Sequence, residues 1–216
     1  NDLIKNPILE RPISEYIIVD IGGGYGVFAE TIKNTNPKEV IVIEPNSKLA
    51  GICRKKGINV IESFFEKKIN DKLPKGLKIF TSFELIEHLY DPRQFLLSLK
   101  EIMSKGDIIY MTTLTSSGID IKELNENSKA ITPPHHINFL SVNGIEELFE
   151  SEGFEEIQIT TPGKLDLDIL KQNKKFLKDG FLLDLINSFS DENIDQLQKL
   201  IAKNKLSSHM LITAKL

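Results

Sequence analysis

The sequence predicts an α/β fold in which a mostly parallel sheet is covered by helices on both faces. Short apolar runs rich in β-branched residues alternate along the chain with segments of helical spacing. The first run, 16–21, leads directly into a glycine cluster, which is typical of a buried strand that turns tightly into a helix. Strands that alternate with helices in this way pair in parallel and bury both of their faces.

The first half of the chain contains the regular part of this pattern. Strands are expected at 16–21, 40–44, 58–61, 77–82 and 107–112, and helices at 27–33, 47–57 and 91–104. Ser47 can cap the second of these helices. Asp91 and Pro92 suit the N-cap and the first helical position of the third.

The second half of the chain is less regular. Residues 114–140 are rich in Ser, Asn and Thr and are typical of a functional loop or lid. The elements expected after it are a helix at 141–152, capped by Ser141, and strands at 154–160 and 208–214. Residues 163–206, between these two strands, are mostly helical with a break at Gly180. We treat them as a helical insertion within a single domain that spans 1–216.

Composition narrows the range of partners. The chain has 216 residues and a formal net charge of −4, whereas proteins that bind nucleic acid usually present a basic face. Its one cysteine, Cys53, cannot form a disulfide within the chain. No apolar run approaches the roughly 18–20 residues that span a bilayer. We therefore expect a cytoplasmic protein that binds neither nucleic acid nor a membrane.

The glycine cluster is the first feature that indicates a ligand. Gly22, Gly24 and Gly26 follow the first strand, where backbone without side chains can approach a ligand closely. A tight turn that binds nothing has the same pattern. Val27 stands where the dinucleotide-binding pattern G-x-G-x-x-G requires glycine, which disfavours a nicotinamide or flavin cofactor. No P-loop pattern occurs in the sequence.

An acid at the end of the second strand is the next feature. A carboxylate at this position, Glu44, can accept hydrogen bonds from both ribose hydroxyls of a nucleoside. The alternative is an acid that only faces solvent at a strand end. Because NAD-binding folds use the same arrangement, Glu44 alone does not choose the cofactor.

Four stretches of sequence carry a family resemblance. They read VDIGGGYGVFAE, VIVIEPN, FTSFELIEHLYDPRQFL and PPHHINFLS followed by ELFESEGF, and they fall within about 17 to 160. In this order and spacing they resemble class I S-adenosylmethionine-dependent methyltransferases, in the group that includes ubiquinone-biosynthesis O-methyltransferases. The resemblance implies a Rossmann-like sheet of seven strands whose last strand is antiparallel, and S-adenosylmethionine as the cofactor.

The resemblance also implies roles for individual residues. The residues expected to bind the cofactor are Asp20, Gly22, Gly23, Gly24, Tyr25, Glu44, Asn46, Ser63, Phe64 and Phe83. Asp20 and the glycines would line its methionine part, Glu44 would hold the ribose, and Asn46 would flank the adenine. Relatives often have an acid near the adenine. The stretch 62–65 reads ESFF here, which leaves open which residue meets the ring.

The chemistry of methyl transfer suggests catalytic residues. Transfer from a sulfonium is an in-line displacement, so the protein contributes mainly by aligning the acceptor and removing its proton. Histidine titrates in a suitable range, near pKa ~6.5. His136 is the first candidate for base or acceptor-orienting residue and His88 the second, with Glu84 at the reactive end of the cofactor. The alternatives are a His136 bonded to backbone and a His88 paired with Glu84 or Asp91. His209 is expected to be structural.

A metal is a further possibility in the same segment. Glu84, Glu87 and His88, together with the distant His136, offer oxygen and nitrogen ligands suited to Mg²⁺, Mn²⁺ or Zn²⁺. The pattern resembles the E-x-x-E-H metal motif of divalent-dependent relatives, including RNA 2′-O-methyltransferases. A bound ion could lower the pKa of an acceptor hydroxyl. Many metal-free relatives share the motif, so both alternatives stay open.

The function favoured by these observations is methyl transfer from S-adenosylmethionine to a small molecule, with a hydroxyl oxygen as the expected acceptor. A metal-assisted RNA 2′-O-methyltransferase and a non-catalytic S-adenosylmethionine-binding protein are the alternatives, and a nicotinamide oxidoreductase is disfavoured. The apolar face of 163–206 predicts packing on the core, a lid over the substrate or a homodimer contact.

Overall fold

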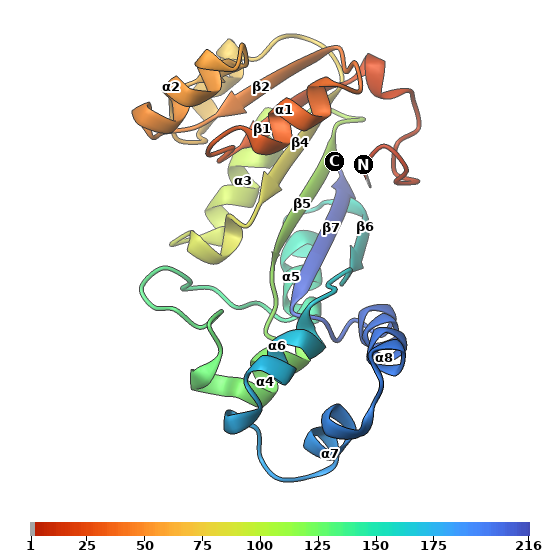
Figure 1. The fold of residues 1–216 in the computed structure, drawn as a ribbon. Coiled ribbons are helices and arrows are strands. Elements are labelled where there is room, and N and C mark those ends of the chain that lie inside the picture. Colours follow the sequence, from red (N-terminus) through yellow and green to blue (C-terminus); the bar gives the residue numbers. More distant parts are fainter. Residues whose placement is uncertain (1–2) are drawn as a thin grey trace.

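The computed structural model describes residues 3–216 and contains a seven-stranded sheet with the strand order β3-β2-β1-β4-β5-β7-β6 (Figure 1). The strands are β1 (Ile17–Ile21), β2 (Glu39–Ile43), β3 (Asn59–Ile61), β4 (Lys78–Phe83), β5 (Ile108–Leu114), β6 (Glu155–Thr160) and β7 (His209–Lys215). The pairs from β3 to β5 are parallel, and β7 is antiparallel to both of its neighbours. The predicted sheet, including its antiparallel last strand, is confirmed.

Helices cover the sheet and extend beyond one of its ends. They are α1 (Val27–Lys33), α2 (Ser47–Lys55), α3 (Pro92–Ile102), α4 (Ile119–Leu124), α5 (Val142–Ser151), α6 (Asp166–Gln172), α7 (Phe181–Ser188) and α8 (Asp191–Lys203). Asp91 caps α3 as predicted, and its side chain accepts a hydrogen bond from the backbone N–H of Gln94. Asn46, and not Ser47, is the N-cap of α2, because its extended backbone lets its side chain accept from the N–H groups of Lys48 and Leu49.

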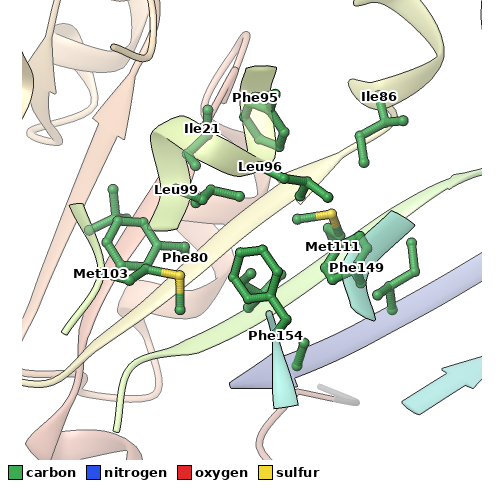
Figure 2. Packing of buried hydrophobic residues seen from close by; sticks show 14 of the residues in the cluster. Ile21, Phe80, Ile86, Phe95, Leu96, Leu99, Met103, Met111, Phe149 and Phe154 are labelled. Atoms are coloured by element: carbon green, nitrogen blue, oxygen red, sulfur yellow. The ribbon is translucent and has the colours of Figure 1, made fainter. Parts of the chain in front are cut away.

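Two apolar layers hold the helices onto the sheet. Figure 2 shows one of them, in which Phe80 of β4 and Met111 of β5 lie against Leu96 and Leu99 of α3 and Phe149 of α5. The opposite face of the sheet packs against α1 and α2 through a second cluster of buried side chains. Alternate residues of each strand therefore face different layers, which explains why β1 and β4 are apolar on both faces.

The helical insertion has an apolar cluster of its own. Residues of α6, α7 and α8 bury their apolar faces together with Leu124 of α4. Figure 1 shows these four helices gathered at the end of the sheet where β5 ends and β7 begins. The prediction that 114–140 is entirely loop is therefore wrong, because α4 lies in it. The helix has only six residues, too few to show a helical period in the sequence. It is stabilised by its tertiary partners.

A buried acid joins the insertion to the sheet. The Asp166 carboxylate accepts hydrogen bonds from the hydroxyls of Ser207 and Ser208, from the Ser208 backbone N–H and from the Gln198 amide. Burial alone would raise the pKa of Asp166, but these bonds outweigh burial and lower it. The start of α6 is thus fixed beside the start of β7.

No helix within residues 3–216 is both long enough and apolar enough to cross a bilayer. The single cysteine, Cys53, is buried and free. The expected cytoplasmic location stays a prediction.

Candidate active site

The glycine turn after β1 brings bare backbone to the edge of the sheet. Gly22, Gly24 and Gly26 all have positive φ angles, of 69°, 54° and 70°, a conformation that side-chain-bearing residues rarely adopt. Gly23 is required for a different reason. A Cβ there would lie 2.8 Å from Asp20 Oδ2 and 2.8 Å from Val42 Cγ1. The turn is thus fixed by its own backbone geometry and by the side chains beneath it.

Glu44 joins this turn to the end of β2. Its Oε2 accepts a hydrogen bond from the Gly24 N–H at 3.0 Å, and its Oε1 accepts one from the Asn46 N–H at 2.8 Å. The residue is 5% exposed, so the alternative of a solvent-facing acid is wrong. An ionised carboxylate can accept about four hydrogen bonds, which leaves capacity for two ribose hydroxyls.

Asp20 lies buried under the turn. It is 1% exposed, and the Thr81 hydroxyl donates to its Oδ1 at 2.9 Å. Burial raises the pKa of Asp20 to about 7, and the Thr81 bond only partly opposes this rise. A cationic ligand group near this carboxyl would favour its charged form.

A cavity of about 620 Å³ opens beside the turn, at the ends of the first four strands. Its walls include Gly22, Pro45, Ser63, Phe64 and His88. This volume lies within the usual range for a small-molecule or cofactor site. The Phe64 ring is 69% exposed and stands at the rim, where a flat ligand could stack on it.

Three of the predicted cofactor residues have other surroundings. Tyr25 is 61% exposed on the outside of the turn, and the Asn46 side chain is occupied as the cap of α2. The Phe83 ring packs against Phe28 of α1, with the ring centroids 4.5 Å apart. Like Asp20, Gly23, Gly24 and Glu44, these three are outside the cavity wall, which contains Gly22, Ser63 and Phe64 of the predicted set. Whether they contact the cofactor stays a prediction.

Glu87, His88 and His136 lie together at the side of the cavity that His88 lines. Each can offer one ligand atom, and these atoms lie within 4.8 Å of one another. His88 Nδ1 donates to the carbonyl oxygen of His135 at 2.8 Å, and His136 Nδ1 donates to that of Ala130 at 2.6 Å. Both rings therefore keep Nε2 as the nitrogen that can accept a proton or a metal.

The Glu87 carboxylate is the buried member of this group. Its Oε2 accepts from the Thr113 hydroxyl at 2.7 Å, whereas its buried Oε1 has no hydrogen-bond partner in the described part of the chain. Burial raises the pKa of Glu87, and the neighbouring Glu84 carboxylate adds to the rise. A cation near Oε1 would offset the cost of burying this oxygen without a hydrogen-bond partner.

Glu84 neighbours Glu87 and also contacts the two strands that follow β4 in the sheet. It has a left-handed backbone with φ of 49°, and its Oε1 accepts from the Thr112 hydroxyl at 2.7 Å. The Nδ1 atom of His209, the first residue of β7, lies 3.5 Å from the same oxygen. Glu84 is thus paired with residues of β5 and β7.

A family model described as a methyltransferase domain matches residues 3–159, well over half of the chain. The chain belongs to this methyltransferase family. The prediction of a class I S-adenosylmethionine-dependent methyltransferase is confirmed, and S-adenosylmethionine is the cofactor that the family uses.

Individual relatives of the methyltransferase are distant. It is 25% identical over 127 residues to the mitochondrial ubiquinone biosynthesis O-methyltransferase of Dictyostelium discoideum. That match covers 52% of this chain and 39% of the relative, so the chain spans well under two thirds of the relative's length.

Solved structures share its fold. A methyltransferase from Archaeoglobus fulgidus is 20% identical, with a TM-score of 0.62 over 95% of this chain and 89% of that one. The phosphoethanolamine N-methyltransferase 2 of Haemonchus contortus is 14% identical, with a TM-score of 0.57 over 95% and 50%.

Glu84 and His209 of the methyltransferase have surroundings that the sequence does not indicate. The ligand group found within residues 3–216 consists of Glu87, His88 and His136, so the expectation that Glu84 belongs to it is not met. His209, expected to be structural, lies beside Glu84 at the edge of the sheet that carries the site, and its role stays a prediction. An antiparallel strand begins where its parallel neighbours end, and this topology is the signal that could have identified the residue.

Proposed function

We propose that this methyltransferase transfers the methyl group of S-adenosylmethionine to a hydroxyl oxygen of a small molecule. One observation carries the proposal. The Glu44 carboxylate accepts a hydrogen bond from the Gly24 N–H beside a cavity of about 620 Å³. A side-chain-free turn, a buried acid and an aromatic rim together match the three parts of the cofactor.

The residues fit the cofactor part by part. Asp20 and the turn would hold the amino-acid end, because a buried carboxyl with a raised pKa gains an ammonium as counter-charge. Glu44 would take the ribose hydroxyls through its remaining lone pairs. Phe64 and Ser63 would contact the adenine, with the exposed Phe64 ring available for stacking.

The acceptor side calls for alignment and a proton acceptor. In the proposed reaction the acceptor lies in line with the methyl group, and its attack releases S-adenosylhomocysteine. His136 orients the acceptor through its free Nε2, and His88 supports it, with the two ring centroids 4.7 Å apart. The net charge of −4 favours a small acceptor over RNA. The Dictyostelium relative is named as an O-methyltransferase of ubiquinone biosynthesis, which supports a hydroxyl.

Calorimetric titration tests the cofactor assignment. S-adenosylmethionine and S-adenosylhomocysteine should bind, and NAD should not. Glu44→Gln should weaken S-adenosylhomocysteine about 10-fold or more, because hydrogen bonds to a charged group contribute about 1.5–3 kcal/mol. Glu39→Gln, at the opposite end of the same strand, is the matched control and should stay within two-fold. Binding of NAD instead, or equal affinities for both variants, would refute the proposal.

A second candidate is metal-assisted transfer, favoured by one observation. Two histidines whose Nδ1 atoms are fixed by backbone carbonyls face a buried carboxylate with an unpartnered oxygen. This is the arrangement that metal-binding histidines usually have. Glu87, His88 and His136 would hold Mg²⁺ or Mn²⁺, and the ion would lower the pKa of an acceptor hydroxyl.

Electron paramagnetic resonance of added Mn²⁺ tests this candidate without requiring turnover. One site should titrate in the wild type and be lost in His136→Asn. If all of the added Mn²⁺ gives the signal of the free ion at every concentration, the proposed metal site is rejected. If activity is found and resists chelators, His136 orients the acceptor directly. If cofactor binds but no hydroxyl acceptor reacts, a non-catalytic binding protein becomes the better account.

We also propose a homodimer contact through 163–206. The insertion exposes three aromatic rings, Phe176 by 40%, Phe181 at the start of α7 by 81% and Phe189 by 38%, and exposed apolar patches mark interaction sites. Sedimentation of the wild type should show a dimer at micromolar concentration, and Phe181→Glu should be monomeric. A monomeric wild type would refute this contact.

A further inference from the structure

We infer that His209, held by Glu84, is the general base for the acceptor, and that the cavity beside it takes an acceptor with an apolar body. This rests on the proposed transfer to a hydroxyl. The inference starts from a histidine and carboxylate that the cofactor site does not use.

The sheet places this pair on the same edge as the glycine turn. Ile21 of β1 pairs with Ser82 of β4, so the glycine turn and Glu84 both lie just beyond that pair. Leu114, at the end of β5, pairs with His209, at the start of β7. The lateral order along this edge is therefore the glycine turn, Glu84, Leu114 and His209. Neighbouring strands lie about 4.8 Å apart, so Glu84 is one strand from the turn and His209 is three strands, roughly 14 Å, from it.

The pair has the geometry of an oriented base. The Glu84 carboxylate is fixed by the Thr112 hydroxyl at 2.7 Å, and it lies 3.5 Å from His209 Nδ1. A carboxylate at Nδ1 selects the tautomer in which Nε2 is free, and it stabilises the imidazolium that forms on proton uptake. Such contacts often shorten only when substrate is bound. In contrast, His88 and His136 have neutral carbonyl oxygens at Nδ1.

A second cavity lies directly against this histidine. It measures about 370 Å³, and its apolar walls are Leu114, Pro162, Leu165 and Ile169. The charged groups around His209 are Glu84 from the end of β4 and, across the cavity, Lys164 and Asp166 from the insertion. These walls suit a single aromatic ring or a short aliphatic body that carries a hydroxyl.

The proton transfer completes the reaction. The acceptor oxygen forms its bond to the methyl carbon while its proton passes to Nε2 of His209. The electron pair of the broken carbon–sulfur bond stays on sulfur, which gives neutral S-adenosylhomocysteine. The imidazolium paired with Glu84 later releases its proton to solvent. Removal of such a base usually costs 10²–10⁴-fold in rate.

A series of para-substituted phenols tests the base. With 4-methylphenol as acceptor, His209→Asn should lower kcat about 100-fold, and S-adenosylhomocysteine affinity should change less than two-fold. The loss should shrink with 4-nitrophenol, because this acceptor ionises without help. Glu84→Gln should give the same trend with a smaller loss, and His136→Asn should mainly raise KM. An equal loss across the series, or no loss, would overturn the base assignment.

A pair of leucines tests the cavity. Leu165→Asp should raise KM for 4-methylphenol about 10-fold, whereas Leu200→Asp, a similarly exposed leucine on α8, should not. In the S-adenosylhomocysteine complex, 4-methylphenol should shift the imidazole NMR signals of His209. If S-adenosylhomocysteine binds but 4-methylphenol causes no shift and no phenol is methylated, this inference alone is overturned. Loss of S-adenosylhomocysteine binding would instead overturn the proposed function.

Discussion

At the scale of single residues, Glu44 and Asp20 show how a cofactor site can be built from groups that also hold the fold. Glu44 links two strand ends through backbone N–H groups and keeps lone pairs free. Asp20 is buried at a cost, since burial raises its pKa to about 7. The folded protein without cofactor therefore carries a carboxyl that would be more stable if it were neutral.

Asp20→Asn should stabilise the cofactor-free protein in a pH-dependent way. The folded pKa of about 7 lies above the ordinary aspartate pKa of 3.8, so stability from this group is complete below about pH 4 and is lost as pH rises to 7. The variant removes that loss. Its free energy of unfolding should exceed that of the wild type by up to about 4 kcal/mol at pH 8. Urea unfolding from pH 5 to pH 8 measures the difference.

The same variant should bind S-adenosylmethionine more weakly, because the ammonium loses its counter-charge. Wild-type affinity should rise as pH increases through 7, and this rise should be absent in Asp20→Asn. A difference in unfolding free energy that is the same at every pH would show that Asp20 is not the titrating group.

At the scale of elements, the glycine turn and the insertion define the two ends of the site. The turn is fixed by positive φ angles and by the contact of Gly23 with Asp20 and Val42. The insertion is fixed by Asp166, which connects α6 to the start of β7. In the proposed function the turn positions the cofactor, and the insertion encloses the cavity beside His209.

Gly23→Ala tests the turn. Its Cβ would approach Asp20 Oδ2 and Val42 Cγ1 to 2.8 Å, so the turn must move and S-adenosylhomocysteine affinity should fall at least 10-fold. Gly51→Ala is the matched control, because a Cβ there meets nothing within 4 Å inside helix α2. It should leave affinity unchanged and add about 0.5–1 kcal/mol of stability. Equal binding by the two variants would show that the turn does not contact the cofactor.

At the scale of the whole molecule, the sheet separates a packed interior from a polar edge. Phe80 is fully buried between β4 and the helices, whereas Phe64 stands 69% exposed at the rim of the cavity. We therefore expect different tasks for the two aromatic residues, stability for Phe80 and cofactor binding for Phe64.

This separation can be measured with two matched substitutions. Phe80→Ala should cost about 3–5 kcal/mol of unfolding free energy, because it leaves a cavity in the core. Phe64→Ala should change stability by less than about 0.5 kcal/mol and weaken S-adenosylhomocysteine several-fold. Thermal unfolding and calorimetry check both values. A Phe64→Ala variant with unchanged affinity would remove that ring from the adenine site.

The sequence was informative where local patterns determine structure. The strands and the cap at Asp91 follow from apolar runs and capping chemistry. The short α4 was missed because its stability comes from contacts with the insertion. The pairing of Glu84 with His209 depends on the register of β7, a strand far along the chain, and no local pattern contains that register.

The crystal structure of the protein with S-adenosylhomocysteine tests the central claim most directly. The ribose hydroxyls should lie within hydrogen-bond distance of the Glu44 carboxylate, the amino-acid end against the glycine turn, and the adenine beside Phe64. A ligand bound elsewhere, or a cavity closed by protein atoms in that crystal, would contradict it.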